Sequence, residues 1–123
     1  MDLVRALLPV VVPAVAGGCR APRLAGLAAE TASDIARTFK ALADPARVRL
    51  LSIIASAPDG EACICDLTEP VGLSQPTVSH HMRLLAEAGL VTREQRGRWA
   101  YFAVAPGARE LVATSTDAVL GDL

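Results

Sequence analysis

The chain has 123 residues, the size of a single domain, which argues against a two-domain enzyme. Its 12 Lys and Arg against 13 Asp and Glu give a formal net charge of −1, so binding to a polyanion must depend on a local basic surface. Hydrophobic residues make up 52% and aromatic residues 3%, which excludes intrinsic disorder for most of the chain and predicts an aliphatic core, typical of packed helices.

The N-terminal stretch is apolar over residues 3–16 and superficially resembles a secretory leader, but Pro9 and Pro13 are unfavourable for the helix of a leader. No run approaches the roughly 20 apolar residues that a membrane span needs. We therefore expect a cytoplasmic protein with no membrane partner. Residues 1–26 are predicted to form a flexible arm, and residues 27–123 the folded domain.

The first two helices are separated by a strong boundary signal. Helical periodicity runs from Ala28 to Ala43. Asp44 can then cap a second helix, and Pro45 stands at its first position, where proline is tolerated. The second helix ends before residues 58–60. The apolar faces expected to be buried comprise Ile35, Phe39 and Leu42 in the first helix, and Val48, Leu51 and residues 54–55 in the second.

A helix-turn-helix is predicted in the middle of the chain. A short helix runs from about Ile64 to Val71 and is closed by Gly72. Ser74 caps the next helix because its hydroxyl can accept hydrogen bonds from backbone N–H groups, and Pro76 is tolerated in a first turn. The three-residue turn between the two helices is typical of this motif.

A β-hairpin and a last helix complete the prediction. Residues 90–96 and 98–104 are extended segments around Gly97. A helix restarts at Pro106, with Leu111, Val112, Ser115 and Val119 on one face. The fold class is therefore mainly α with a β-hairpin wing, a winged helix-turn-helix. Topology alone leaves DNA binding open, because any helical bundle can contain such a turn.

The helix after Ser74 has one polar face. If Val78 points to the core, Met82 and Leu85 do so too, and His81 lies at the edge of the core. The outward side chains can donate to base edges or phosphates near the start of a recognition helix. The predicted DNA contacts on this face are Ser74, Gln75, Thr77, Ser79, His80 and Arg83.

Arginines also gather on the hairpin. Arg93, Arg96 and Arg98 lie around Gly97, and residues 79–101 hold four arginines against two glutamates. Such a cluster can equally be a solvated surface. Arg96 and Arg98 are added to the predicted DNA contacts.

Four segments of the chain resemble the ArsR/SmtB family of winged-helix metal-responsive repressors: residues 42–47, 63–67, 72–81 and 88–91. The similarity covers residues 34–105, and the run Ser-Gln-Pro-Thr-Val-Ser-His-His is its most specific part. The resemblance implies a homodimer through the first and last helices. It also implies that the apo dimer occupies double-stranded operator DNA and that ligand binding lowers its affinity.

The cysteines bear on what is sensed. Cys63 and Cys65 point about 200° apart on a regular helix, so both can bind one ion only where the helix begins or is distorted. Thiolates favour soft ions, although two small buried hydrophobic residues remain the alternative. Three cysteines, an odd number, favour a reducing cytosol over a disulfide scaffold.

The family's arsenite sensors are similar to this chain at Cys-x-Cys-Asp-Leu, but many carry a third Cys where this sequence has Thr68. Cys19 is the remaining thiol. We therefore predict a three-thiolate site of Cys19, Cys63 and Cys65, with Cys19 supplied by the opposite subunit. Arsenite or antimonite would be the inducer ligand, and no permanent cofactor is expected.

Other functions are compatible with some of the same residues. A repressor of this fold could respond to cadmium, lead or oxidants, and a cytosolic metal-buffering protein could use the cysteines without DNA. An enzyme is not expected, because His80 and His81 are adjacent on a helix and no nucleophile motif appears. A second family site, for zinc, nickel or cobalt, is set aside because residues 106–123 contain no histidine.

Overall fold

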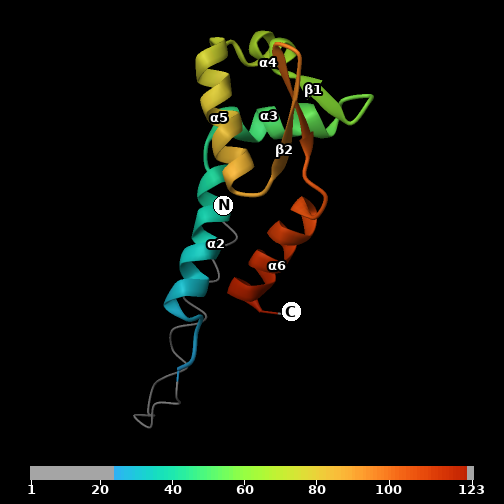
Figure 1. Cartoon of the computed structure of the whole chain (residues 1–123). Coiled ribbons are helices and arrows are strands. Elements are labelled where there is room, and N and C mark those ends of the chain that lie inside the picture. The colour runs from blue at the N-terminus through green and yellow to red at the C-terminus, as the bar shows by residue number, and fades with distance from the viewer. Residues whose placement is uncertain (1–23, 122–123) are drawn as a thin grey trace.

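The computed structural model describes residues 24–121, and over this range it confirms a winged helix-turn-helix. Figure 1 shows α3, α4, α5 and the sheet as one compact body, from which α2 and α6 extend together. The elements in chain order are α2 (Ala29–Leu42), α3 (Pro45–Ala55), β1 (Glu61–Cys63), α4 (Ile64–Val71), α5 (Gln75–Glu87), β2 (Val91–Arg96), β3 (Trp99–Val104) and α6 (Ala108–Leu120).

The helix boundaries follow the predicted caps. The Asp44 carboxylate accepts hydrogen bonds from the N–H groups of Ala46 at 2.8 Å and Arg47 at 3.2 Å. Partial burial opposes its ionisation, but these two bonds and the charges of Arg47 and His81 outweigh that effect, so the pKa of Asp44 lies below its ordinary value of 3.8. The Ser74 hydroxyl accepts from the N–H of Thr77 in the same way.

The sheet has three antiparallel strands in the order β1-β3-β2, and not only the two of the predicted hairpin. The added strand, β1, places Glu61 opposite Ala103 and Cys63 opposite Tyr101. Three residues are too few for an alternating pattern to be recognised, and the pairing partner lies about 40 residues away in sequence. The hairpin of β2 and β3, which we call the wing, turns at Gly97 with φ +61°.

The core lies between α3, α4, α5 and the sheet. Its fully buried larger side chains are Leu50, Ile54, Leu67, Val78, Met82, Leu85 and Leu90. The face predicted for α3 was wrong in part. Ile54 is fully buried as predicted, but Leu50, which was not predicted, also faces the core, while Val48 is 50% exposed. That helix is apolar on most sides, so periodicity could not single out the side that packs against both α4 and the sheet.

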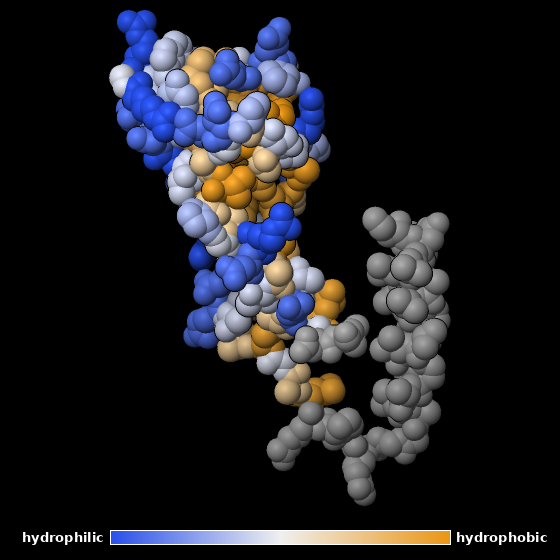
Figure 2. Space-filling model, turned by 90° about the vertical axis from the view of Figure 1, so that its right-hand side faces the viewer, coloured by the Kyte–Doolittle hydropathy of each residue, from blue (hydrophilic) through white to orange (hydrophobic). Residues whose placement is uncertain are grey.

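The terminal helices leave apolar side chains at the surface. Thr38 and Ala41 are the buried residues of α2, whereas Phe39, predicted to be buried, is 36% exposed. Val119 of α6 is likewise exposed. Figure 2 shows orange, hydrophobic groups on the lower part of the molecule, where α2 and α6 lie. Within residues 24–121 no helix is both long and apolar enough to cross a membrane.

We predict that the helix-turn-helix depends on Gly72, whose φ of +69° ends α4. No heavy atom lies within 4 Å of a Cβ built at this position, so a substitution there meets backbone strain but no clash. Gly72→Ala should therefore lower the free energy of unfolding in urea by about 1–2 kcal/mol. Gly72→Asn should lose less, because asparagine adopts the left-handed conformation more readily.

The matched control is Gly26→Ala, which also has open space around it but no positive φ. It should change stability little. Equal unfolding midpoints for the Gly72→Ala and Gly26→Ala variants would show that the turn does not require the left-handed conformation.

Candidate nucleic-acid interface and thiol site

The polar face of α5 is exposed as predicted. Val78, Met82 and Leu85 are fully buried, and the predicted contacts Ser74, Gln75, Thr77, Ser79, His80 and Arg83 are all exposed. The Arg83 guanidinium donates to Nδ1 of His80 at 2.9 Å, which requires that nitrogen to be unprotonated. The helix therefore presents a compact set of donors and acceptors to the solvent.

His81 lies at the edge of the core, also as predicted. It is half-buried, and its Nδ1 is 3.2 Å from Nη1 of Arg47. The same guanidinium donates from Nε to the carbonyl oxygen of Ala41 at 2.7 Å. Arg47 on α3 thus joins the end of α2 to α5, and His81 serves to position the helix.

The wing has two faces of different charge. Side chains alternate along β2, and the pairing places Arg93 opposite Phe102 and Glu94 opposite Tyr101. Arg93 lines a cleft between α5 and the wing, together with Arg83 and Arg98. Arg93 was not among the predicted DNA contacts. Side-chain alternation along β2 could have separated Arg93 from Arg96, because residues at odd and even positions of a strand point to opposite faces. Arg93 and Gln95 share the face that lines the cleft.

Arg96, a predicted DNA contact, lies on the other face. Its guanidinium donates to both carboxylate oxygens of Glu61, at 2.5 and 2.8 Å, and to Glu94 at 2.7 Å, and it stacks over the Tyr101 ring at 4.4 Å. The hydrogen bond from Arg96 holds the pKa of Glu61 below its ordinary value. Two carboxylates thus compensate the charge of Arg96, which clamps the wing to β1.

The cysteine pair occupies the boundary between β1 and α4. Cys63 is the last residue of the strand and the N-cap of α4, with φ −75° and ψ 144°. Its Sγ accepts a hydrogen bond from the N–H of Cys65 at 3.3 Å, and the Cα atoms are 5.2 Å apart. The extended backbone at Cys63 turns both sulfur atoms to the same side, as expected where a helix begins.

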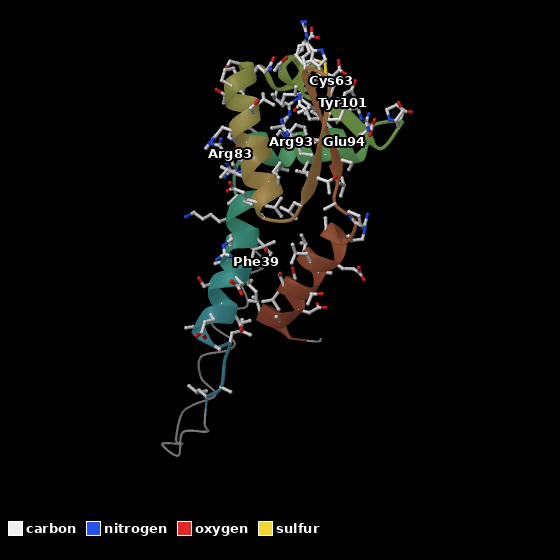
Figure 3. The ribbon with its side chains drawn as sticks, in the orientation of Figure 1. Phe39, Cys63, Arg83, Arg93, Glu94 and Tyr101 are labelled. Atoms are coloured by element: carbon white, nitrogen blue, oxygen red, sulfur yellow. A yellow bond between two sulfur atoms is a disulfide. The ribbon has the colours of Figure 1, made fainter. Side chains whose placement is uncertain are left out.

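The structure joins these two sulfur atoms in a disulfide, where a reduced pair was expected (Figure 3). Cys63 is 3% exposed, whereas Cys65 is open to solvent. Cys19 lies outside the described residues. Between residues 24 and 121, no three His, Cys, Asp or Glu side chains gather in a group that could hold a metal ion.

Comparison with known proteins identifies relatives of the helix-turn-helix region. The family described as "Bacterial regulatory protein, arsR family" matches residues 44–93. An arsenical resistance operon repressor of Bacillus subtilis is 38% identical over 77 residues, which cover 59% of this chain and 71% of that protein. The arsenic resistance transcriptional regulator ArsR1 of Pseudomonas putida is 43% identical over 68 residues, and the match spans 55% of this chain and 52% of that protein.

A solved structure shows the same fold. It is the solution structure of a homodimeric winged helix-turn-helix DNA-binding domain from Mycobacterium bovis, described as a possible ArsR-family transcriptional regulator. The two chains superpose with a TM-score of 0.57 at 25% identity, over 76% of this chain and 84% of that one.

We predict that the clamp between Glu61 and Arg96 makes stability depend on pH. The pKa of Glu61 is lowered from 4.5 in the folded protein, so the clamp stabilises at neutral pH and is lost as the pH falls through the lowered value. The melting temperature of the wild type should exceed that of Glu61→Gln at pH 7, and the difference should shrink below about pH 4.5.

The control for this comparison is Glu69→Gln. Glu69 is an exposed carboxylate of α4 that takes part in none of the ion pairs found in the described range. The difference in melting temperature between Glu69→Gln and the wild type should not shrink below about pH 4.5 in the same way. If the difference in melting temperature between the wild type and Glu61→Gln stayed constant from pH 7 to pH 3, the clamp would have no stabilising role.

Proposed function

Because the chain belongs to the ArsR family of bacterial regulatory proteins, we propose that it is a homodimeric repressor that releases operator DNA when arsenite or antimonite binds its cysteine thiolates. The observation that carries the proposal is the convergence of Cys63 and Cys65 at the first residues of the helix-turn-helix. A ligand held there acts on the element that positions α5.

Binding to DNA is supported by the exposed face of α5. In a winged helix-turn-helix, the recognition helix enters the major groove and the wing reaches the neighbouring backbone. The cleft between α5 and the wing is lined by three cationic residues, Arg83, Arg93 and Arg98. A chain of net charge −1 thereby presents a local cationic surface to phosphates.

Dimerisation is supported by the terminal helices. Leu27, Phe39, Val119 and Leu120 are exposed apolar residues in or beside α2 and α6, which pack against each other. Burial of such side chains against a second copy removes apolar surface from water. Two recognition helices would then meet half-sites about one helical turn apart on an inverted repeat.

The inducer is proposed to bind through sulfur. Trivalent arsenic as arsenous acid forms one As–S bond with each thiol and loses one water for each bond, so three thiols release three waters. Cys63 and Cys65 supply two of the thiols once a cellular thiol has reduced the disulfide. Cys19, from the opposite subunit, is proposed as the third.

Coupling to DNA follows from the position of Ile64. This residue stands between the two cysteines, is 3% exposed, and lines the cleft between α5 and the wing. A ligand that holds the reduced Cys63 and Cys65 at a separation different from that in the disulfide would therefore move a side chain that lines the cleft between α5 and the wing. A coupling free energy of about 1–3 kcal/mol changes operator affinity roughly 5- to 150-fold.

The disulfide favours a second candidate, a repressor that senses oxidants. Hydrogen peroxide would oxidise the Cys63 and Cys65 thiols to the disulfide and be reduced to two waters. This candidate needs the same α4 start and the same DNA surface, but it needs neither a metalloid nor Cys19.

Fluorescence anisotropy on a fragment of the protein's own promoter tests these functions. Reduced protein should bind tightly, and about one equivalent of arsenite per site should weaken binding roughly 5- to 150-fold. Release by peroxide alone would select the oxidant sensor, and release by cadmium or lead alone would select those ions. A protein that bound metalloid but no DNA would be a metal buffer.

Cysteine variants test the three-thiolate site. Cys65→Ser should keep operator affinity, because Cys65 is exposed and packs little. It should lose the arsenite response, because one of the proposed sulfur ligands is removed. Cys19→Ser should lose the response to a similar degree if it supplies the third thiolate. An unchanged arsenite response in Cys19→Ser would leave a two-thiolate site and exclude the proposed ligand from the N-terminal region.

A further inference from the structure

The disulfide between Cys63 and Cys65 holds two sulfur atoms in different surroundings. Cys63 is 3% exposed and belongs to the buried core, whereas Cys65 is exposed to solvent. Both residues are cysteines of the same bond and stand two positions apart, so the difference arises from the fold and not from the residue type. A reagent in solution therefore reaches one sulfur atom of the pair far more easily than the other.

Cys63 is enclosed because it is a strand residue. It pairs with Tyr101 of β3, and directly opposite residues of antiparallel strands have Cβ atoms about 4.5–5.5 Å apart on one face of the sheet. Figure 3 labels Cys63 and Tyr101 beside each other. The Arg96 guanidinium lies 4.4 Å from the centre of the Tyr101 ring and donates hydrogen bonds to Glu61 and Glu94. The clamp thus keeps an aromatic ring in place beside Cys63.

Cys65 lies outside this cover because the chain changes from strand to helix before it. β1 ends at Cys63, so the pairing with β3 stops before Cys65. In α4 the side chain of Ile64 is 3% exposed, whereas Cys65 and the following Asp66 are exposed to solvent. The start of the helix therefore turns the second sulfur-bearing residue outward.

The backbone also favours Cys63 as the leaving group. Disulfide exchange begins when a thiolate attacks one sulfur atom, and the other sulfur departs as a thiolate. The N–H of Cys65 donates to Sγ of Cys63 at 3.3 Å. A hydrogen bond is stronger when its acceptor is charged, so this contact stabilises negative charge on Cys63. Attack at Cys65 uses the accessible sulfur atom and releases the one that accepts a hydrogen bond.

We propose that Cys65 is a site of S-thiolation by low-molecular-weight monothiols, while the wing shields Cys63 from them. The incoming thiolate forms a bond to Sγ of Cys65, the bond between the two Sγ atoms breaks, and its electron pair stays on Sγ of Cys63. The products are a mixed disulfide at Cys65 and a thiolate at Cys63. A second monothiol then attacks the sulfur of the first, forms the disulfide of the monothiol and frees Cys65. The inference requires neither DNA nor a metalloid, and so goes beyond the proposed function.

The test uses glutathione and the full-length protein in its disulfide form, without DNA. Samples are quenched in acid at successive times, unfolded and alkylated, and tandem mass spectrometry locates glutathione and the alkyl group on each cysteine. Glutathione should occupy Cys65 roughly tenfold more often than Cys63. The control is the same reaction in concentrated urea, where Cys63 is no longer buried and the ratio should fall to about 1. Cys19→Ser, which removes the third cysteine of the chain, should give the wild-type ratio.

Two variants of Tyr101 test the cover over Cys63. Tyr101→Phe keeps the aromatic ring and should retain the preference for Cys65. Tyr101→Ala removes the ring and should lower the ratio of glutathione on Cys65 to glutathione on Cys63 toward the value in urea. Thermal unfolding of both variants verifies that they are folded. If Tyr101→Ala does not fold, the comparison of the native wild type with the protein in urea decides alone.

Three outcomes would contradict the proposal. Equal occupancy of Cys63 and Cys65 in the folded protein would overturn it, as would a disulfide that glutathione opens only in urea. A folded Tyr101→Ala protein with the wild-type ratio would overturn the shielding by the wing. A wild type that binds no operator DNA, or that ignores arsenite, contradicts the proposed function and leaves each of these measurements intact.

Discussion

The extended backbone at Cys63 is the constraint on which the arrangement depends, because this one residue ends β1 and begins α4. As a strand residue it pairs with Tyr101 of the wing, and as an N-cap it accepts a hydrogen bond from the N–H of Cys65. The short α4 then leads through Gly72 to α5. Sheet, wing and recognition helix are therefore joined at the same point as the two sulfur atoms, and a change at that point reaches all three.

The alternation of side chains along β2 places the unpaired and the paired charges of the wing on opposite faces of the strand. Arg93 and Gln95 face α5, where the cleft holds cations without carboxylates. Glu94 and Arg96 face the other way and, with Glu61, form a compensated cluster. The cluster holds β1 against the hairpin while the opposite face stays cationic. A net charge of −1 is thus compatible with a surface suited to phosphates, since acidic residues are kept off that surface.

The sequence predicted the features that depend on local chemistry. Asp44, Ser74 and Gly72 set the helix boundaries through capping and a positive φ, and these signals need no knowledge of the rest of the fold. Features that depend on distant partners were missed. β1 exists because β3 accepts it, and Arg96 is compensated because β1 places Glu61 beside it. The buried face of α3 and the exposure of Phe39 likewise depend on tertiary packing rather than on periodicity.

Ile64 connects the cysteine pair to the cleft between α5 and the wing. Its side chain lines the cleft and its backbone lies between the two cysteines, so under the proposed function a shift of the α4 start would change the shape of the cleft. A ligand shifts the equilibrium between two positions of the α4 start only by its difference in affinity for them. If a ligand at Cys63 and Cys65 weakens DNA binding, as proposed, linkage requires the reverse effect: operator DNA weakens ligand binding at these cysteines by the same factor. Under that proposal, the thiols retain a ligand least well when the protein is bound to its operator.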